Sequence, residues 1–600
     1  MLLLPLAAAL PLWGASLTAT DPGRMTDLGL LSVLPPAFYL ALALLAIGFF
    51  LALHARGGRG WLPGAYLAGW IVVVHATPSV LYGSLRYSWA WKHAGIVEYV
   101  RRTGSIDPTI DVLPVYHNWP GFFGAAALIA EAAGQDEAIG LATWAPPFFE
   151  LLFSAAVLLV LRGATGDPRL AWAGTWFFAV ANWVGQDYFA PQAMAYACFL
   201  VVVGATLWAF PGPLPEVART ASALGRWPLV AAALEYLRRR VAAGERDGRG
   251  LPQLAPSQRR GLLVLVVLLL GAMAVSHQLT PVATVLALSA FVLFGRRSAW
   301  GLPVAAAVLT ALWWVTGASS YVTVGLREVI ASFGLPEQNV EANLIDVSQF
   351  GPGVRLVSAM ARGVTAAVGL IAVLGWLRRL RRGVLDPGMT LLWLAPLGLL
   401  AVSGYGGEVL FRVYFFALPA MAFFVAALCY PAPEAGRGRR GALLPILLTA
   451  ALATGSLFAY YGHERTNYFR PGEVAAADFL AETAPSGSLV IEASSNYPSR
   501  HRRYEQFTYV PLVAWARGNA EESRNAYTLA DIEEMMADPR YPAAFLIVSR
   551  SQIEGLSLPG QASVEDLLRQ VEASDDFAPL LANGDATVYG LAERGPGGAS

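Results

Sequence analysis

Residues 84–120 read SLRYSWAWKHAGIVEYVRRTGSIDPTIDVLPVYHNWPGF, a polar and aromatic stretch between two apolar segments. The apolar segments, residues 61–83 and 141–161, are each near the roughly 20 residues that a helix needs to cross a bilayer. Residues 88–102 place Trp, Ile and Val on one side of a helix, and Gly104 follows as a helix terminator. Such an amphipathic helix is typical of the membrane interface. The stretch therefore predicts a long surface loop on a chain that crosses the membrane.

The composition of the whole chain supports this prediction. Charged residues are 14% of the 600, against roughly 25% in soluble globular proteins, and hydrophobic residues are 56%. One soluble core cannot bury that excess, so the predicted fold class is a polytopic α-helical membrane protein. We predict thirteen spans, at residues 1–19, 34–53, 61–83, 141–161, 170–185, 191–210, 261–276, 281–295, 301–317, 355–377, 388–404, 411–430 and 441–460. The first is read as a retained helix, with cleavage as a signal peptide the alternative.

Arginine-rich loops predict the orientation. Residues 54–60, 162–169, 211–260 and 378–382 are basic, and positive loops face the cytoplasm. They share one side only if residues 119–134 do not cross, and that helix would be about 24 Å long, short of a bilayer core of roughly 30 Å. The N-terminus is then cytoplasmic, and the protein is placed in the cell (plasma) membrane with its C-terminal part outside.

The last segment of the chain differs from the rest. Residues 461–600 hold eleven Arg against twenty Asp and Glu, and helix-like and strand-like patterns alternate there. This predicts a small external α/β domain, with strands near 488–493, 545–550 and 586–592. The predicted organisation is two N-terminal spans at 1–60, a transmembrane domain at 61–460 with outer loop 84–134 and cytoplasmic loop 211–260, and the external domain at 461–600.

The sequence lacks the motifs that mark several common classes of enzyme. Two distant cysteines exclude a disulfide scaffold, and with Lys92 as the only lysine there is no phosphate-binding Gly-x-x-x-x-Gly-Lys loop. No metalloprotease, Asp-x-Asp or Gly-x-Ser-x-Gly motif is present. The preference for Arg over Lys reads as a composition bias, so no nucleic-acid partner is predicted.

Polar side chains gather at the predicted outer ends of several spans, which suggests an outward-facing cavity. Asp187 and His277 are candidate general bases, with Glu98 a further candidate catalytic residue. Arg412 could stabilise an anionic leaving group and should pair with Glu408 one turn earlier. The candidate substrate-binding residues are Lys92, His93, His117, Asn118, Trp119, Tyr188, Gln192, Gln278, Glu408 and Arg412.

Each candidate also has a simpler structural role. Trp and Tyr are common membrane-interface anchors, a histidine between two helices often bonds a backbone carbonyl, and an Arg–Glu pair can be purely structural. Asp187 could be an ordinary hydrated carboxylate in a short outer turn. The gathering of such groups on one side argues for a site more strongly than any single member.

The order of elements resembles the GT-C superfamily of membrane glycosyltransferases, from about residue 61 to 590. In that family the first surface helix ends in Gly, as at Thr103-Gly104, and a His/Lys-Pro-Pro-like motif is resembled by His117–Pro120. Ala145-Pro146-Pro147 is similar to the opening of the next span, and Asp187 matches an acidic residue in the outer turn that follows. The resemblance implies a polyprenyl-phosphate sugar donor, membrane lipid contact and a glycan, lipid or protein acceptor. Carboxylates such as Asp187 could also hold a divalent cation, Mg or Mn.

One family position is replaced here. The family has an Asp or Asp-Glu about fifteen residues before the helix-ending Gly, and that register falls on Trp89-Ala90. Either another carboxylate, Glu98, Asp107, Asp111 or Asp187, serves instead, or the chemistry is changed. Three hypotheses follow: a glycosyltransferase acting on the outer face, a transporter or flippase for lipid-linked sugars, and a non-catalytic relative that binds glycan or a partner.

Overall fold

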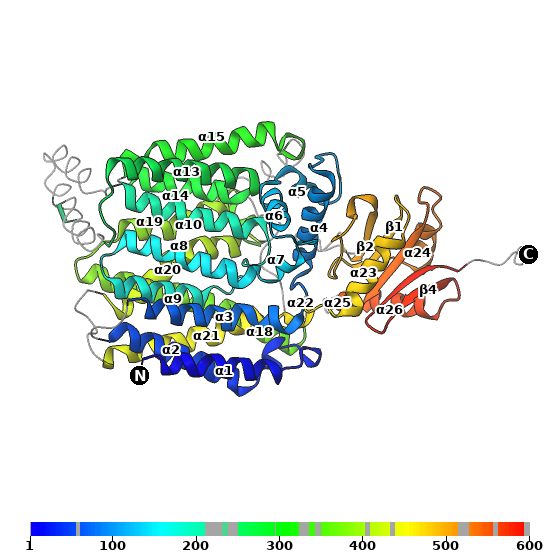
Figure 1. The fold of residues 1–600 in the computed structure, drawn as a ribbon, viewed down its shortest axis with the longest axis horizontal. Helices are drawn as coiled ribbons and strands as arrows, with labels where there is room; N and C mark the ends of the chain where they lie inside the picture. Colours follow the sequence, from blue (N-terminus) through cyan, green and yellow to red (C-terminus); the bar gives the residue numbers. More distant parts are fainter. Residues whose placement is uncertain are drawn as a thin grey trace, which may run out of the picture.

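A bundle of long helices and a smaller α/β domain make up the computed structural model (Figure 1). It describes residues 2–55, 60–210, 232, 235–236, 250–294, 296–322, 335–341, 350–402, 408–431, 439–513, 527–555 and 562–592. Most of the predicted cytoplasmic loop 211–260 lies outside these ranges. The same is true of Tyr405, which the sequence places beside Glu408.

Helices occupy all thirteen ranges predicted as spans. They are α1 (Leu4–Thr18), α2 (Pro36–His54), α3 (Leu62–Tyr82), α8 (Ala145–Ala164), α9 (Pro168–Ala181), α10 (Pro191–Ala209), α13 (Pro256–Ser276), α14 (Leu279–Leu293), α15 (Gly301–Thr316), α18 (Pro352–Arg381), α19 (Pro387–Leu394) with η4 (Ala395–Ala401), α20 (Val409–Cys429) and α21 (Leu443–Tyr461). Within the described residues, eight of them are long and apolar enough to cross a membrane: α2, α3, α8, α10, α13, α18, α20 and α21. The chain is thus a multi-pass membrane protein by helix length and composition, and the count of thirteen stays a prediction.

Helix α20 forms the centre of the bundle. Its apolar window is 83% buried, and it packs against α9, α18 and α19. Tyr196 of α10 stacks on Phe415 with ring centroids 3.7 Å apart. On the α18 side, a Cβ at Gly375 would lie 1.8 Å from the Phe424 carbonyl oxygen, so only glycine permits that close approach.

Four short helices cover one end of the bundle. They are α4 (Ser88–Thr103), α5 (Pro114–Asn118), α6 (Gly121–Ala132) and α7 (Ile139–Thr143), and they lie between the long helices and the α/β domain (Figure 1). The predicted surface helices of loop 84–134 are therefore present. Helix α4 ends where predicted, at Gly104 with φ of 73°, the left-handed conformation that glycine adopts at helix ends.

The α/β domain contains a five-stranded sheet in the order β2-β1-β3-β5-β4. The strands are β1 (Leu489–Ser494), β2 (Thr508–Val513), β3 (Ala544–Ser549), β4 (Phe577–Ala582) and β5 (Ala586–Leu591), and β1 is parallel to both β2 and β3. Helices α24 (Leu529–Met536) and α26 (Ala562–Ala573) cover one face, and α23 (Pro471–Thr483) covers the other. Alternate residues of β1 point to the two faces, as a two-residue period requires.

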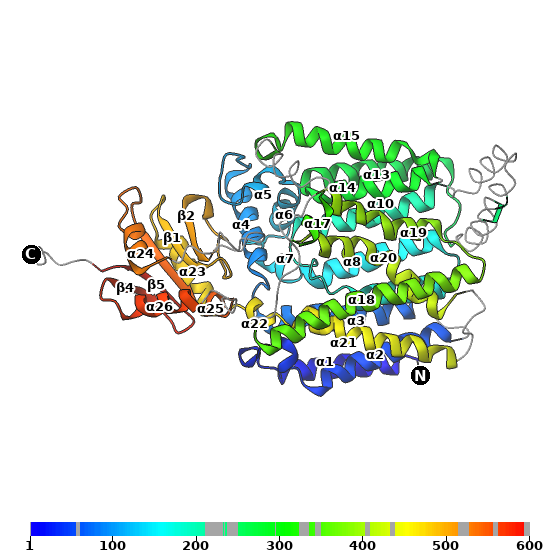
Figure 2. The same cartoon turned by 180° about the vertical axis from the view of Figure 1, so that it is seen from behind.

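Two short helices pack together where the domain meets the bundle. Helix α22 (Glu464–Asn467) follows α21 directly, and α25 (Arg550–Gly555) follows β3. Figure 2 shows α22 between the end of α21 and the α/β domain. The linker, residues 464–470, runs from α22 to the start of α23.

Candidate functional site

Asp187 lies in the turn between α9 and α10, at the end of the bundle near the surface helices. It is 1% exposed, which corrects the expectation of a hydrated loop carboxylate. Its Oδ2 accepts hydrogen bonds from His75 Nδ1 at 2.6 Å and from the Tyr460 hydroxyl at 2.7 Å. Burial raises the pKa of Asp187, but the hydrogen bond from His75 and the charge of Arg86 outweigh it, and the pKa lies below its usual range. The carboxylate is therefore ionised at neutral pH.

A second buried acid accompanies Asp187. Glu150 of α8 is 0% exposed and accepts a 2.7 Å hydrogen bond from Asn182 Nδ2. One ligand atom from each of His75, Glu150 and Asp187 lies within 4.8 Å of the others. These three residues, called here the carboxylate–histidine triad, join α3, α8 and the α9–α10 turn.

The triad fits a divalent cation by its unsatisfied atoms. In the described part of the chain, His75 Nε2, Glu150 Oε1 and Asp187 Oδ1 are buried without a hydrogen-bond partner. Leaving such groups buried and unpaired is costly, so a ligand or water normally satisfies them. Ligand atoms this close suit a single ion bound at about 2.0–2.6 Å, and an imidazole beside two carboxylates favours Mn²⁺ over Mg²⁺.

Arg86 contacts Tyr460, the residue whose hydroxyl donates to Asp187. Its Nη2 donates to the Tyr460 carbonyl at 2.8 Å, and its guanidinium carbon lies 4.1 Å from the Tyr460 ring centroid. Arg86 is itself paired with Glu464, which is 0% exposed. Within the described residues, Arg86 Nη1 has no hydrogen-bond partner, so its two N–H groups remain available.

Arg412 reaches the same turn from α20. It donates to Gln186 Oε1 at 2.7 Å and to Glu408 Oε2 at 2.7 Å, so the predicted pairing with Glu408 is present. Because Gln186 precedes Asp187, the guanidinium of Arg412 contacts the turn that carries the ionised carboxylate.

His277 also lies on this side, but its ring caps a helix. Nδ1 accepts from the backbone N–H groups of Leu279 and Thr280 at the start of α14. Burial and the charge of Arg412 hold the pKa of His277 well below its usual value. These donors assign the ring proton to Nε2, so the neutral ring is suited to donate a hydrogen bond rather than accept a proton. Gln278 follows His277 and is partly buried.

Aromatic rings pack against Tyr188, the residue after Asp187. Tyr188 is stacked on His93 with ring centroids 5.7 Å apart, and His93 Nδ1 bonds the Phe189 carbonyl at 2.8 Å. Burial lowers the pKa of His93 to about 4, so it is neutral. Gln192, at the start of α10, is 3% exposed, and both atoms of its amide have no partner in the described ranges. His93 thus packs against Tyr188 and Phe189, which follow Asp187 in the same turn, and the role of His93, Tyr188 and Gln192 in substrate binding stays a prediction.

Five other predicted site residues lie in contacts within α4 or between elements. Glu98 pairs with Arg102 on α4, and Lys92 donates to the Ser495 carbonyl of the α/β domain. His117 Nε2 is 2.6 Å from the Tyr504 hydroxyl. Asn118 accepts from Ser320 Oγ at 2.8 Å, and Trp119 is 3% exposed against Tyr321. The structure does not bring these five to the Asp187 turn.

The sequence reading misses three central residues. His75, Glu150 and Tyr460 lie within segments predicted as plain apolar spans. One signal could have found two of them, because an ionisable residue inside a membrane span is rare and usually functional. Glu150 is the only acid in residues 141–161, and His75 is an isolated polar ring in residues 61–83.

Several solved structures are similar to this chain. One is an oligosaccharyltransferase from Archaeoglobus fulgidus tethered by a disulfide bond to an acceptor peptide containing the NVT sequon; it is 11% identical, with 89% of this chain and 75% of that chain covered and a TM-score of 0.47. ArnT from Cupriavidus metallidurans, bound to undecaprenyl phosphate, is 12% identical, with 93% and 98% covered and a TM-score of 0.42. The apo form of ArnT is 12% identical, with 87% and 97% covered and a TM-score of 0.40.

No protein-family model and no curated protein matches the sequence. The resemblance to the GT-C superfamily therefore stays a prediction from the sequence. At such identities and TM-scores the similar structures assign no residue, donor or acceptor to this chain.

Proposed function

We propose that this protein is a glycosyltransferase that moves a sugar from a polyprenyl-phosphate donor to a glycan, lipid or protein acceptor of the cell envelope. The observation that carries the proposal is the buried carboxylate–histidine triad beside two arginines, at the end of the bundle covered by the surface helices. Ionised carboxylates and guanidinium groups kept apart from bulk water are the groups that a transfer from a phosphate leaving group requires. The outer face of the plasma membrane is the proposed location.

In the proposed reaction, an acceptor hydroxyl attacks the anomeric carbon of the donor. Asp187 takes the hydroxyl proton through its unpaired Oδ1 as the new C–O bond forms. The bond between the anomeric carbon and the phosphate oxygen breaks, and polyprenyl phosphate leaves with the electron pair. His75 and Tyr460 hold Oδ2, so the carboxylate is oriented before the acceptor arrives.

The donor phosphate is proposed to bind Arg412 and Arg86. Arg412 is held beside the Asp187 turn by its hydrogen bond to Gln186. The unpaired Nη1 of Arg86 supplies a further donor to the phosphate. His75 Nε2 and Glu150 Oε1 would hold a divalent cation, which would neutralise charge developing on the leaving phosphate, and Asp187 Oδ1 would stay open to the acceptor proton. Tyr188 and Gln192 provide a ring face and an amide for a sugar beside Asp187.

The test is purified protein incubated with a panel of labelled polyprenyl-phosphate sugars and Mn²⁺. We expect sugar release or transfer from at least one donor, with loss of turnover on chelation. Asp187→Asn keeps the shape of the side chain and removes its charge, so turnover should fall by roughly 10²-fold or more while donor affinity changes much less.

Other outcomes would favour the alternatives. Specific donor binding without turnover would favour a non-catalytic relative, to which the Trp89-Ala90 replacement also points. Movement of intact donor across a vesicle membrane would favour a transporter. Normal turnover in Asp187→Asn would shift the role to Glu98, Asp107 or Asp111, and tolerance of the amide at all four positions would contradict the proposal.

A further inference from the structure

The carboxyl edge of the parallel strands in the α/β domain is occupied by the chain itself. In open α/β sheets, ligands bind at this edge where the strand order reverses, which here is between β1 and β3. Asn496, just after β1, donates to the Thr466 carbonyl at 3.0 Å. Ser551, just after β3, donates to the Asn496 carbonyl at 3.0 Å. The linker 464–470 therefore lies where such a domain would otherwise bind a ligand.

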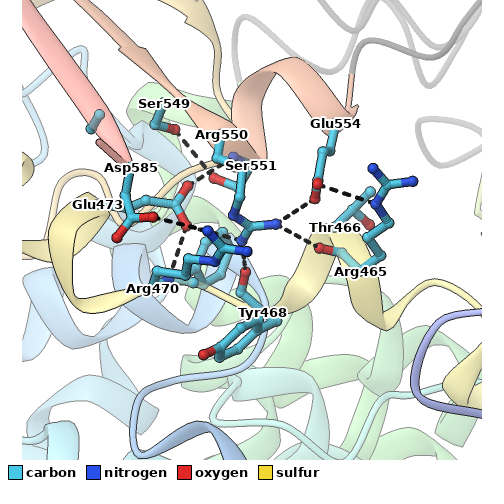
Figure 3. Close-up of polar contacts among 12 residues, drawn as sticks. Arg465, Thr466, Tyr468, Arg470, Glu473, Ser549, Arg550, Ser551, Glu554 and Asp585 are labelled. Atoms are coloured by element: carbon cyan, nitrogen blue, oxygen red, sulfur yellow. Dashed lines mark hydrogen bonds and ion pairs between the residues drawn. The ribbon is translucent and has the colours of Figure 1, made fainter. Parts of the chain in front are cut away.

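Arg550, the first residue of α25, binds the linker from this edge of the sheet (Figure 3). Its guanidinium donates to the Tyr468 carbonyl and to Glu554, and it pairs with Glu473 at 3.0 Å. Glu473 is 0% exposed and also accepts from the backbone N–H groups of Arg470 and Ser551. One arginine thus ties the sheet edge, the linker and the start of α23 together.

The same linker begins with the residue that holds Arg86. Glu464 accepts from Arg86 Nε at 2.9 Å, from the Tyr82 hydroxyl at 2.8 Å and from Asn467 Nδ2 at 3.0 Å. Arg86 in turn holds Tyr460 by its carbonyl and ring. A continuous series of contacts therefore runs from Arg550 through the linker to the hydroxyl that orients Asp187.

We propose that the α/β domain positions the transfer site, with Arg550 and Glu464 as positioning residues. The edge of the sheet holds the linker, the linker holds Glu464, and Glu464 fixes Arg86 and Tyr460 against Asp187. Removing one member of a buried charge pair leaves the other charge unpaired, so a local change should propagate along this series. The inference deepens the proposed function and rests on it for its consequence, although the mechanical coupling can be measured without turnover.

The test uses full-length protein carrying Arg550→Gln and hydrogen exchange of peptides from residues 182–190. We expect exchange there to quicken roughly tenfold, the scale of one lost hydrogen bond to a charged group. Arg540→Gln is the matched control, because Arg540 is 79% exposed and pairs with Asp538 on the same surface turn. That variant should exchange like the wild type, as should residues 162–169 in either variant.

Unchanged exchange at 182–190, with loosening confined to the linker and the sheet edge, would overturn the proposal. If Arg550→Gln fails to fold, Arg550→Lys takes its place, because it keeps the charge but lacks the planar group that bonds both Tyr468 and Glu473. Hydrogen exchange of the peptides from residues 182–190 then gives the result. A wild type without turnover would contradict the proposed function alone, since the exchange result does not depend on it.

Kinetics with the donor identified above distinguish positioning from mere stability. We expect Arg550→Gln and Glu464→Gln each to lower kcat by roughly 10- to 100-fold with little change in KM, because a misplaced carboxylate affects the chemical step. If they act in series, the double variant should be no slower than the worse single variant. Multiplied effects, or a raised KM with normal kcat, would overturn the coupling.

Discussion

Lys92 lies on the face of α4 that meets the α/β domain. It is 3% exposed, its Nζ donates to the Ser495 carbonyl at 3.1 Å, and it lies 4.4 Å from the Trp89 ring centroid. Burial, and then the charge of Arg500, lower its pKa to about 7, against a partial opposing effect of Glu492. Protonation of Lys92 is therefore less favourable in the folded protein than in the unfolded chain.

The sign of the pH effect follows from that lowered pKa. Between about pH 7 and 10.5 the unfolded chain binds the Lys92 proton and the folded chain does not, so the free energy of unfolding rises with pH in this window. Lys92→Met should remove this contribution, and the Tm of the wild type relative to the variant should rise as the pH is raised. Thermal unfolding in detergent across that window tests it; a constant difference in Tm would show that Lys92 keeps its ordinary pKa.

At the scale of elements, α4 and the loop after β1 meet without a gap. A Cβ placed on Gly95 would lie 1.8 Å from the Arg500 carbonyl oxygen. Side-chain contacts extend the interface, since Trp91 meets the ring of His501 and Arg102 pairs with Glu505. The absence of a side chain at one position of α4 is thus what lets the α/β domain sit against the surface helices.

Gly95→Ala should therefore weaken this interface. The backbone must move to avoid the new methyl group, and overpacking of this kind costs about 1–3 kcal/mol. Gly124→Ala is the matched control on α6, where a Cβ meets no atom within 4 Å among the described residues, so it should stabilise by about 0.5–1 kcal/mol. Limited proteolysis between α21 and α23 should quicken in the first variant alone. Equal protection in both would mean that the interface adapts.

The helices were predictable from local sequence, whereas the site depended on distant pairings. Apolar length and period depend on neighbouring residues, so a helix in each of the thirteen ranges and the helix ending at Gly104 could be predicted. Asp187 could be named because of its place in an outer turn. Its partner His75 is 112 residues away in sequence and Tyr460 is 273 away, and the contacts depend on how helices pack. Strands β2 and β4 were missed because each contains a proline, Pro511 or Pro579, and most of their residues are only partly buried or exposed.

At the scale of the whole molecule, the two ends of the bundle carry different parts of the chain. The α/β domain and the surface helices share one end (Figure 1). Gly250 accepts a 2.6 Å hydrogen bond from Arg162, which is near the end of α8 opposite α7. Because α8 has 20 residues, about 30 Å of helix separates that end from the surface helices. Gly250, in segment 211–260, therefore lies at the end of the bundle opposite the α/β domain.

Fusions of alkaline phosphatase test which end faces outward. The enzyme needs disulfides that form only outside the cytoplasm, so its activity reports the side on which the fusion lies. The arginines of 211–260 predict a cytoplasmic location, so a fusion after residue 245 should be inactive and one after residue 520 active. The reverse pattern would leave the fold intact but turn the molecule over, placing the transfer site on the cytoplasmic face. Equal activity at both positions would contradict the separation of the two ends, and with it the single-sided site built from Asp187, Arg86 and Arg412.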